Sequence, residues 1–410
     1  MNGNILFYII IAILVLQFII EQGLEYLNAQ RYGDPLPQEL EDVFDKNEYL
    51  KSREYKKTNY RFGWISAIFS TGLTLLFLIF GGFEWIDTIA RSLSSDPIPM
   101  ALIFFGIILI GNDIITTPFS YYQTFVIEEK FGFNKSTKKL FWSDKIKGWC
   151  MMMVLGGGML ALIIWFFQRA GTNFWIYAWI MISVVTLFIN LFYSRLIVPI
   201  FNKQTPLQDG SLKNKIEDYA DQVGFTVKNI FVLDGSKRST KANAYFSGFG
   251  REKRITLYDT LLNDLEEDEI VAVLAHEVGH YKRRHVIFNL AASIALTGFT
   301  LFILSIFINN PGMSLAIGVS QPSFHAALIG FGILYSPISE ITGLIMNVMS
   351  RTFEYQADNF ARKTYSSRPL IQALKNLSKN NLSNLTPHPA YVFMHYSHPP
   401  LIARIRNLKA

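Results

Sequence analysis

The residues best suited to chemistry in this 410-residue chain are His276, Glu277 and His280, which form the pattern His-Glu-x-x-His. Two His four positions apart share one face of a helix, so both imidazoles can hold one Zn²⁺ ion. The Glu between them can take a proton from the water that attacks a substrate. The chain has 7 His, and chance alone would produce such a pattern about 0.005 times. The spacing therefore predicts a zinc hydrolase.

A catalytic zinc needs a third protein ligand, and Glu354 is the candidate. It follows the last apolar segment and so returns to the membrane face where His280 lies. Asp358 is four residues later on the same helical face, where a carboxylate can orient a ligand. His285 would lie about 140° around the axis from His280 on one continuous helix, so we expect an interfacial residue there. His325 is expected on the opposite side of the membrane.

Several shorter elements position these residues. The His-Glu-x-x-His helix is expected to start near Asp264, with Glu267 completing a capping box, and to continue into the next apolar segment. Gly279 inside it costs about 1 kcal/mol relative to Ala, which indicates that another backbone comes close. Hydrophobic periodicity predicts further elements: a helix over 211–223, strands over 227–232, 242–246 and 254–258, a Gly-rich turn at 248–250, and a helix over about 350–364.

The composition is that of a membrane protein. Charged residues make up 17% and aromatic residues 15%, and the mean hydropathy is +0.24. These values exclude a disordered chain or a collagen-like fibre, and a single Cys excludes a disulfide scaffold. Seven apolar segments are long enough to cross a bilayer as helices: 4–20, 64–82, 98–118, 149–167, 174–198, 286–308 and 324–348.

The loops between these segments orient the chain. Seven Lys and Arg lie between the first and second segments and six between the third and fourth, whereas the alternate loops are nearly bare of them. Positive charge stays on the cytoplasmic side, so the N-terminus is expected outside. Four regions follow: segments one to five with their loops (1–198), a cytoplasmic metalloprotease unit (199–285), segments six and seven (286–348), and a cytoplasmic C-terminal part with the third ligand (349–410).

The chain resembles the Ste24-type CAAX prenyl proteases, which are integral membrane zinc metallopeptidases. Matching stretches occur along nearly the whole chain: 26–31, 128–134, 234–239, 243–248, 254–262, the HEVGH pattern, 354–358 and 397–401. One departure is Lys241-Ala242 before Asn243, where eukaryotic members carry His-Ser. This departure leaves the metal site intact but weakens a claim about the native substrate.

The resemblance implies a fold and roles for individual residues. The fold class is an all-α membrane protein, with seven transmembrane helices around a chamber and a small cytoplasmic α+β metalloprotease unit. Glu354 matches the third zinc ligand and Glu277 the base. Asn243 and Ala244 match a strand that lines the cleft, and an edge strand can bind an extended peptide through its main chain. His398 and Arg404 match residues near the catalytic water or the scissile carbonyl.

The expected activity is endopeptidase cleavage near the C-terminus of a peptide. The resemblance implies a prenylated CAAX substrate and a water-filled chamber, and a chamber within the membrane would suit a lipidated tail, which needs apolar surroundings. We expect one Zn²⁺ per chain, a monomer, a lipid bilayer around it and no nucleic-acid partner. The compact length favours a bacterial inner membrane over an endoplasmic reticulum, with the site on the cytoplasmic side. Two alternatives stay open. One is a quality-control protease of the HtpX type, and the other is a transporter, for which polar residues in the apolar segments would be typical.

Overall fold

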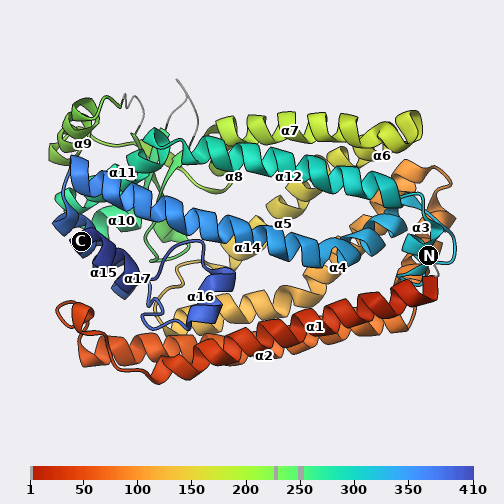
Figure 1. Cartoon of the computed structure of the whole chain (residues 1–410), viewed down its shortest axis with the longest axis horizontal. Helices are drawn as coiled ribbons and strands as arrows, with labels where there is room; N and C mark the ends of the chain where they lie inside the picture. The colour runs from red at the N-terminus through yellow and green to blue at the C-terminus, as the bar shows by residue number, and fades with distance from the viewer. Residues whose placement is uncertain (1–2, 226–229, 248–253) are drawn as a thin grey trace.

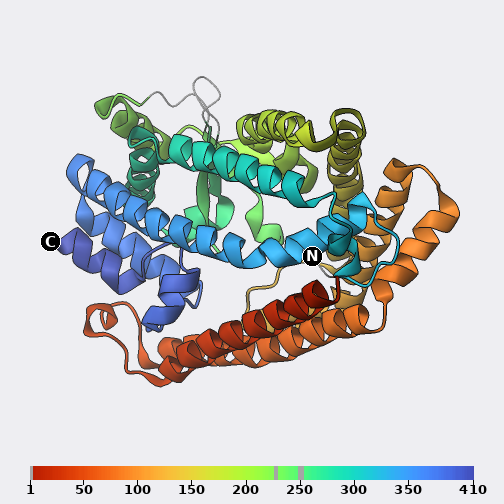
Figure 2. The same ribbon diagram turned by 45° about the vertical axis from the view of Figure 1, so that its right-hand side comes forward.

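Figure 1 shows a computed structural model of the whole chain, which describes residues 3–225, 230–247 and 254–410. Long helices run lengthwise through an elongated bundle, and the sheet and the C-terminal helices lie at one end. Two of these helices, α1 (Gly3–Gln30) and α2 (Lys46–Ile79), lie along one side. On the opposite side are α7 (Phe174–Phe192) and α12 (His285–Phe307), and α14 (Phe324–Thr364) runs between the two sides (Figures 1 and 2).

Shorter helices complete the bundle and cover the sheet. The remaining α-helices are α3 (Gly82–Leu93), α4 (Pro97–Tyr122), α5 (Lys138–Met151), α6 (Gly158–Ala170), α8 (Val198–Phe201), α9 (Ser211–Gln222), α10 (Asp259–Asp264), α11 (Glu267–Lys282), α13 (Pro311–Leu315), α15 (Ser367–Asn380), α16 (Pro389–His395) and α17 (Leu401–Lys409). The other helical turns are η1 (Arg31–Gly33), η2 (Gln38–Leu40), η3 (Gln123–Glu128), η4 (Met152–Gly157), η5 (Gly171–Asn173), η6 (Tyr193–Ile197) and η7 (Gly235–Lys237). The predicted helix over 211–223 is confirmed as α9.

The described residues contain six helical stretches long and apolar enough to cross a membrane, so the chain is a multi-pass membrane protein. Each of five of the six overlaps one predicted segment, although the predicted segments 64–82 and 286–308 extend past the ends of their stretches at Ile79 and Phe307. The sixth, Lys138–Phe201, has 64 residues and contains both the fourth and the fifth. A straight helix of that length would be about 96 Å long, about three times the thickness of a hydrocarbon core. The stretch turns at Gly171, whose φ is +55°, and α6 then packs against α7. The count of seven crossings remains a prediction.

The His-Glu-x-x-His helix is shorter than its sequence suggested. It is α11, which begins at Glu267 with a capping box formed by Glu266 and Glu269, so the prediction of a start near Asp264 is wrong. It ends at Lys282, and α12 begins separately at His285. Between them Arg284 has φ 61°, in the left-handed region that a continuous right-handed helix does not use. The prediction of one helix running into the membrane is therefore also wrong.

One 41-residue helix, α14, replaces two predicted elements. The membrane segment over 324–348 and the helix over 350–364 are continuous, although Pro337 lies inside. A proline cannot donate to the carbonyl four residues before it. The Ser336 hydroxyl donates to that carbonyl, Ile333 O, at 2.8 Å, which leaves it satisfied. The continuous helix carries Glu354 from the membrane region to the sheet end of the bundle.

The small sheet has four strands in the order β1-β2-β4-β3. They are β1 (Gln204–Pro206), β2 (Ile230–Leu233), β3 (Ala244–Ser247) and β4 (Arg254–Tyr258). β2 and β4 are parallel, and the other two pairs are antiparallel. The strand over 254–258 is confirmed, and the one over 242–246 begins two residues later. Part of the strand predicted over 227–232, and the turn at 248–250, lie outside the described residues.

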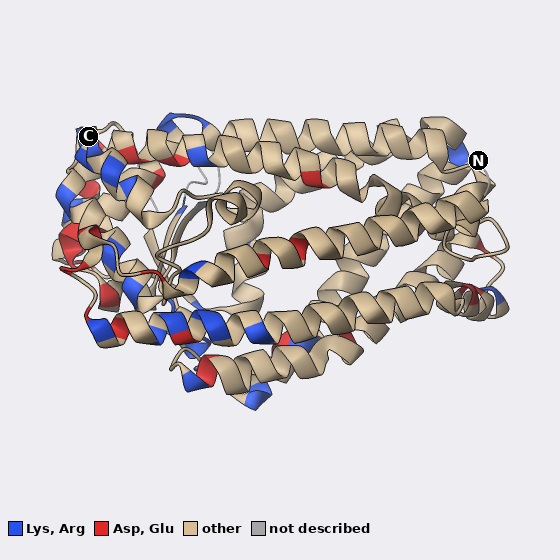
Figure 3. Ribbon diagram, turned by 60° about the horizontal axis from the view of Figure 1, so that its bottom comes forward, with Lys and Arg blue, Asp and Glu red and all other residues tan. Residues whose placement is uncertain are grey.

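Packing and charge divide the bundle into two ends. One buried apolar cluster holds the membrane helices together, and a second lies between the sheet, α11 and α15. Lys and Arg gather at the end that carries the sheet and the C-terminus (Figure 3). Between the helices, the interior is hollowed by a cavity of about 440 Å³ beside α1 and α2 and one of about 480 Å³ beside α12 and α14.

Candidate metal centre and catalytic site

His276 and His280 lie on one face of α11, and Glu354 reaches them from α14. The Nε2 atoms of the two His are 3.1 Å apart. Glu354 Oε1 lies 3.1 Å from His280 Nε2, and Glu354 Oε2 lies 3.4 Å from His276 Nε2. In the part of the chain that the structure describes, these are the side chains whose ligand atoms could hold a metal, all within 4.8 Å of one another. The three ligands expected from the sequence thus converge on one point.

Gly279 explains why α11 and α14 can come so close. A Cβ added at this position would lie 3.0 Å from Ala357 Cα and 3.1 Å from Ala357 O. Both atoms belong to the backbone of α14 and cannot move aside as a flexible side chain could. The absence of a side chain at Gly279 therefore sets the helix separation at which Glu354 meets both imidazoles.

A buried ion pair lies behind His276. Asp358 Oδ1 is 2.9 Å from His276 Nδ1. Arg404, on α17, donates to both carboxylate oxygens of Asp358, from NH2 at 2.6 Å and from Nε at 2.9 Å. Asp358 is fully buried, so the bidentate Arg compensates its charge where water cannot. With Asp358 accepting from Nδ1, the Nε2 atom of His276 is directed at Glu354 and the candidate metal position.

The electrostatics of this cluster favour a cation. Burial and Arg404 lower the pKa of His276, but Asp358 and Glu354 outweigh them and raise it to about 9 in the metal-free protein. Glu354 Oε2 is buried and accepts no hydrogen bond of good geometry, although three nitrogens lie within 3.5 Å of it. Two imidazole nitrogens and an unsatisfied carboxylate oxygen are a donor set that fits a divalent metal.

His398 approaches the same carboxylate from the other side. Its Nδ1 lies 2.9 Å from Glu354 Oε2, and 65% of its side chain is exposed. It belongs to the loop that follows α16. Arg351, three residues before Glu354 on α14, fixes that loop by donating to Val392 O at 3.2 Å and to Tyr396 O. One helix therefore carries both a candidate metal ligand and the residue that positions the His398 loop.

Glu277 projects from α11 toward the sheet. It lines a small cavity together with Ala244 and Leu257, and its carboxylate makes no hydrogen bond with any other described residue. The side chain is half-buried. A carboxylate without a partner among the described residues, beside the candidate metal ligands and next to a strand, can accept a proton from a substrate water.

Among the described residues, the strand next to Glu277 has one edge that no other strand covers. β3 is the last strand of the sheet, and its Ala244 pairs with Leu257 in register. Tyr258 N–H donates to Asn243 O at 3.1 Å, so the 243–258 pair is the hydrogen-bonded one. Bonded and non-bonded pairs alternate in an antiparallel ladder, so the N–H of Ala244 points away from β4. It donates instead to Asn243 Oδ1, at 2.9 Å.

The loop before β3 is fastened to the membrane helices by Lys241. Its Nζ lies 2.8 Å from Glu128 Oε2 and 3.0 Å from the hydroxyl of Tyr55, which donates to Glu128 Oε1 at 2.6 Å. Burial lowers the pKa of Lys241, but Glu128 and Tyr55 outweigh it and raise the pKa. Lys241, which departs from the eukaryotic pattern, thus places a cation opposite Glu128 and holds the loop before β3 in place.

His285 is the residue of this site that the sequence argument misplaced. Its Nδ1 lies 3.0 Å from Nδ1 of His280, and its Nε2 lies 3.0 Å from Gln356 Oε1. An angle of about 140° between the two His applies to a continuous helix, whereas the break at Arg284 turns His285 back toward His280. His325 is at the other end of α14, where its Nε2 lies 2.6 Å from Asp87. Gln356 was not predicted as a site residue. Its position two residues after Glu354 is the one feature of the sequence that could have indicated it.

Two acidic residues in the membrane helices, Asp113 and Glu340, have partners. Asp113 accepts from Lys145 Nζ at 2.8 Å and from Trp149 Nε1 at 2.8 Å. Glu340 accepts from Gln17 Nε2 at 2.6 Å. These contacts join neighbouring helices and account for Asp113 and Glu340 without a transport path. The His-Glu-x-x-His helix, the third ligand and the apolar bundle together define a membrane-embedded metallopeptidase.

Comparison with known proteins gives the family. The family model "CAAX prenyl protease N-terminal, five membrane helices" matches residues 25–203, and "Peptidase family M48" matches residues 206–410. CAAX prenyl protease 1 of Saccharomyces cerevisiae is 37% identical over 96% of this chain and 93% of its own. The homolog from Homo sapiens is 33% identical over 91% of this chain and 88% of its own. The crystal structure of S. mikatae Ste24p is similar with a TM-score of 0.94, at 35% identity and 99% coverage of both chains.

The chain therefore belongs to peptidase family M48 and is a metalloendopeptidase that acts on peptides or proteins. The match of residues 25–203 to the membrane helices of CAAX prenyl proteases favours this type of M48 peptidase over a quality-control protease of the HtpX type. Membership of a peptidase family also excludes the alternative that the main activity of the protein is transport.

Proposed function

We propose that the metal is zinc, one ion per chain, held by His276, His280 and Glu354. We also propose that the enzyme, acting as a monomer, hydrolyses a peptide bond near the C-terminus of CAAX substrates, prenylated ones included. The observation that carries the proposal is the convergence of two imidazole nitrogens and one carboxylate within 4.8 Å. Zinc peptidases use this set of ligands and leave a position open for chemistry. The names of the relatives support the substrate class.

Glu277 is the proposed general base. When bound, zinc would polarise the scissile carbonyl and lower the pKa of the attacking water. Glu277 accepts a proton from that water and then delivers it to the leaving amine. The position of Glu277 in one cavity with Ala244 supports this role, because a peptide paired along β3 would present its carbonyl beside the carboxylate.

The other residues orient the reaction. Asp358 accepts the Nδ1 proton of His276, so that Nε2 is the ligand atom. Arg404 balances the charge of Asp358 and keeps it ionised. His398 has an exposed imidazole beside Glu354, from which it can donate a hydrogen bond to the oxyanion that develops on the carbonyl. Asn243 and Ala244 bind the substrate main chain at the open edge of β3.

The active site is proposed to face the cytoplasm. Lys and Arg gather at its end of the bundle, and positive charge stays on the cytoplasmic side of a membrane (Figure 3). The compact chain length favoured a bacterial inner membrane over an endoplasmic reticulum. The yeast relative, however, is covered over 93% of its length, so length does not distinguish the two membranes.

The test is a metal measurement paired with a cleavage assay. Protein purified in detergent without added metal is analysed for zinc, and a farnesylated CAAX peptide with a fluorescent reporter is offered as substrate. We expect about one zinc per chain and release of the C-terminal residues, lost on chelation and restored by added zinc. The same peptide without the farnesyl group is the control for the lipid. Zinc-loaded protein that leaves both peptides intact would rule out the proposed function.

A further inference from the structure

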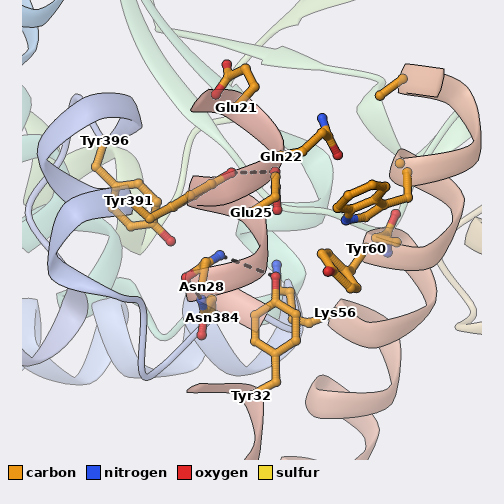
Figure 4. Close-up of a pocket in the computed structure, with 14 residues that line it drawn as sticks. Glu21, Gln22, Glu25, Asn28, Tyr32, Lys56, Tyr60, Asn384, Tyr391 and Tyr396 are labelled. Atoms are coloured by element: carbon orange, nitrogen blue, oxygen red, sulfur yellow. Dashed lines mark hydrogen bonds between the residues drawn. The ribbon is translucent and has the colours of Figure 1, made fainter. Parts of the chain in front are cut away.

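A polar pocket lies beside the catalytic site, on the wall formed by α1, α2 and the chain around α16. Its volume is about 440 Å³. Figure 4 shows Glu25, Lys56 and Tyr391 around it, each coming from a different one of these three elements. Trp64, from α2, also lines it. The metal site lies outside this pocket, and none of its ligands belongs to the lining.

The acidic groups of the pocket already have partners. Glu25 Oε1 accepts a hydrogen bond from the hydroxyl of Tyr391 at 3.0 Å. Glu21 Oε2 lies 3.0 Å from His395 Nε2. Both carboxylates are thus engaged with α16. They hold that helix against α1 and do not offer a free anionic site.

Two donors of the pocket, Lys56 Nζ and Trp64 Nε1, have no acceptor among the described residues. Lys56 makes no ion pair or hydrogen bond with another described residue, and its Nζ lies 5.4 Å from the ring centroid of the adjacent Tyr55. Trp64 Nε1 is buried and donates to nothing in the described chain. Buried donors in native proteins normally have an acceptor. A cation and an N–H that share one cavity without acceptors therefore indicate an anionic ligand with hydrogen-bond-accepting oxygens.

The pocket is within reach of a substrate held at the metal. Tyr396, which lines the pocket, is two residues before His398, so the two backbones are at most about 7 Å apart. His398 in turn contacts Glu354. Three residues in extended conformation span about 10 Å. The last three residues of a CAAX chain could therefore extend from the scissile bond into the pocket.

We propose that this pocket binds the C-terminal α-carboxylate of the substrate, through an ion pair with Lys56 and a hydrogen bond from Trp64 Nε1. The inference rests on the proposed function, since it assumes cleavage close to a free C-terminus. The α-carboxylate is the anion that every such substrate carries, whatever its side chains. Its recognition would explain how a protease with a main-chain-binding strand selects chain ends over internal bonds.

The experiment compares two farnesylated peptides that differ only at the C-terminus, a free carboxylate in one and a carboxamide in the other. Binding to the zinc-loaded Glu277→Gln protein is measured together with cleavage by the protein that retains Glu277. We expect the carboxylate peptide to bind at least tenfold more tightly. Adding Lys56→Met should remove most of that difference by weakening the carboxylate peptide alone, and Trp64→Phe should reduce it severalfold. Lys57→Met, an exposed neighbour on α2, should leave the ratio unchanged.

Each other outcome has a definite reading. The inference would be overturned if the protein that retains Lys56 bound the two peptides equally. It would also be overturned if Lys56→Met weakened the binding of both peptides to the same extent. If Lys56→Met relieves only inhibition by the released tripeptide, the pocket holds the product and its role in substrate selection is wrong. Discrimination in binding with no cleavage of either peptide would keep the inference and contradict the proposed function. Cleavage of the peptides with no difference in binding between carboxylate and carboxamide would support the proposed function and contradict the inference.

Discussion

His285 Nδ1 lies 3.0 Å from His280 Nδ1, and its Nε2 lies 3.0 Å from Gln356 Oε1. If both imidazoles are neutral, only one placement of their protons satisfies these two hydrogen bonds, because the carbonyl oxygen of Gln356 can only accept. His285 then donates from Nε2 and accepts at Nδ1, and His280 donates from Nδ1. That tautomer leaves His280 Nε2 unprotonated and directed at Glu354. His285 therefore selects the tautomer in which His280 can ligate a metal.

The first prediction concerns this chain of contacts. His285→Leu removes the acceptor for His280 Nδ1, so we expect zinc affinity to fall by about 10- to 100-fold, the usual effect of losing such a partner. Competition with a chromogenic chelator measures it. His285→Asn can supply an acceptor oxygen and should lose less. Equal affinity of the Leu variant and the parent protein would show that His285 only fills space.

The second prediction concerns the ligands. His280→Ala removes one of three donors, and we expect the purified protein to contain little zinc. Glu354→Gln should also lose most of it, because the amide brings no negative charge. Elemental analysis gives the zinc content, and circular dichroism checks the fold. Full zinc content in His280→Ala would exclude His280 as a ligand.

The third prediction separates metal binding from catalysis. Glu277→Gln keeps the size of the side chain but cannot take a proton. We expect normal zinc content and turnover reduced by about 10² or more, the usual contribution of a general base. Single-turnover cleavage of the reporter peptide measures the loss. Near-normal turnover in this variant would remove Glu277 from the mechanism.

The fourth prediction tests the open edge of β3. Ala244→Pro removes an N–H that points away from β4, so the sheet keeps its ladder and the protein should fold and bind zinc. Cleavage of every peptide should fall, because the lost bond is to the substrate main chain. Asn243→Ala should act more mildly, by about 1 kcal/mol. A defect confined to one peptide sequence would contradict main-chain binding.

The fifth prediction concerns the orientation of the chain in the membrane. A reporter fused after Ile308, in the loop before α14, should lie outside the cell or in the lumen, and one fused after Ala410 should lie in the cytoplasm. Paired enzymatic reporters that are active on opposite sides measure this directly. A cytoplasmic signal from the first fusion would overturn the predicted orientation.

Much of this protein follows from local patterns in its sequence. The spacing of His276 and His280 places both on one helical face, because the α-helix repeats every 3.6 residues. Asp358 follows Glu354 by one turn for the same reason. The apolar segments are recognisable because a bilayer demands long uninterrupted apolar runs. These features depend on neighbours in the chain, and the structure contains the helices that they predicted.

Tertiary structure alone decided the rest. The positive φ of Arg284 ends α11 and turns His285 toward His280, which no helical periodicity can express. Arg404 meets Asp358 because α17 packs on α14. Lys56, which has no ion-pair partner in the described part of the chain, lines a pocket because α1, α2 and α16 come together there. Such contacts join residues far apart in the chain, and they depend on how whole helices pack, whereas sequence spacing determines geometry only within one regular element.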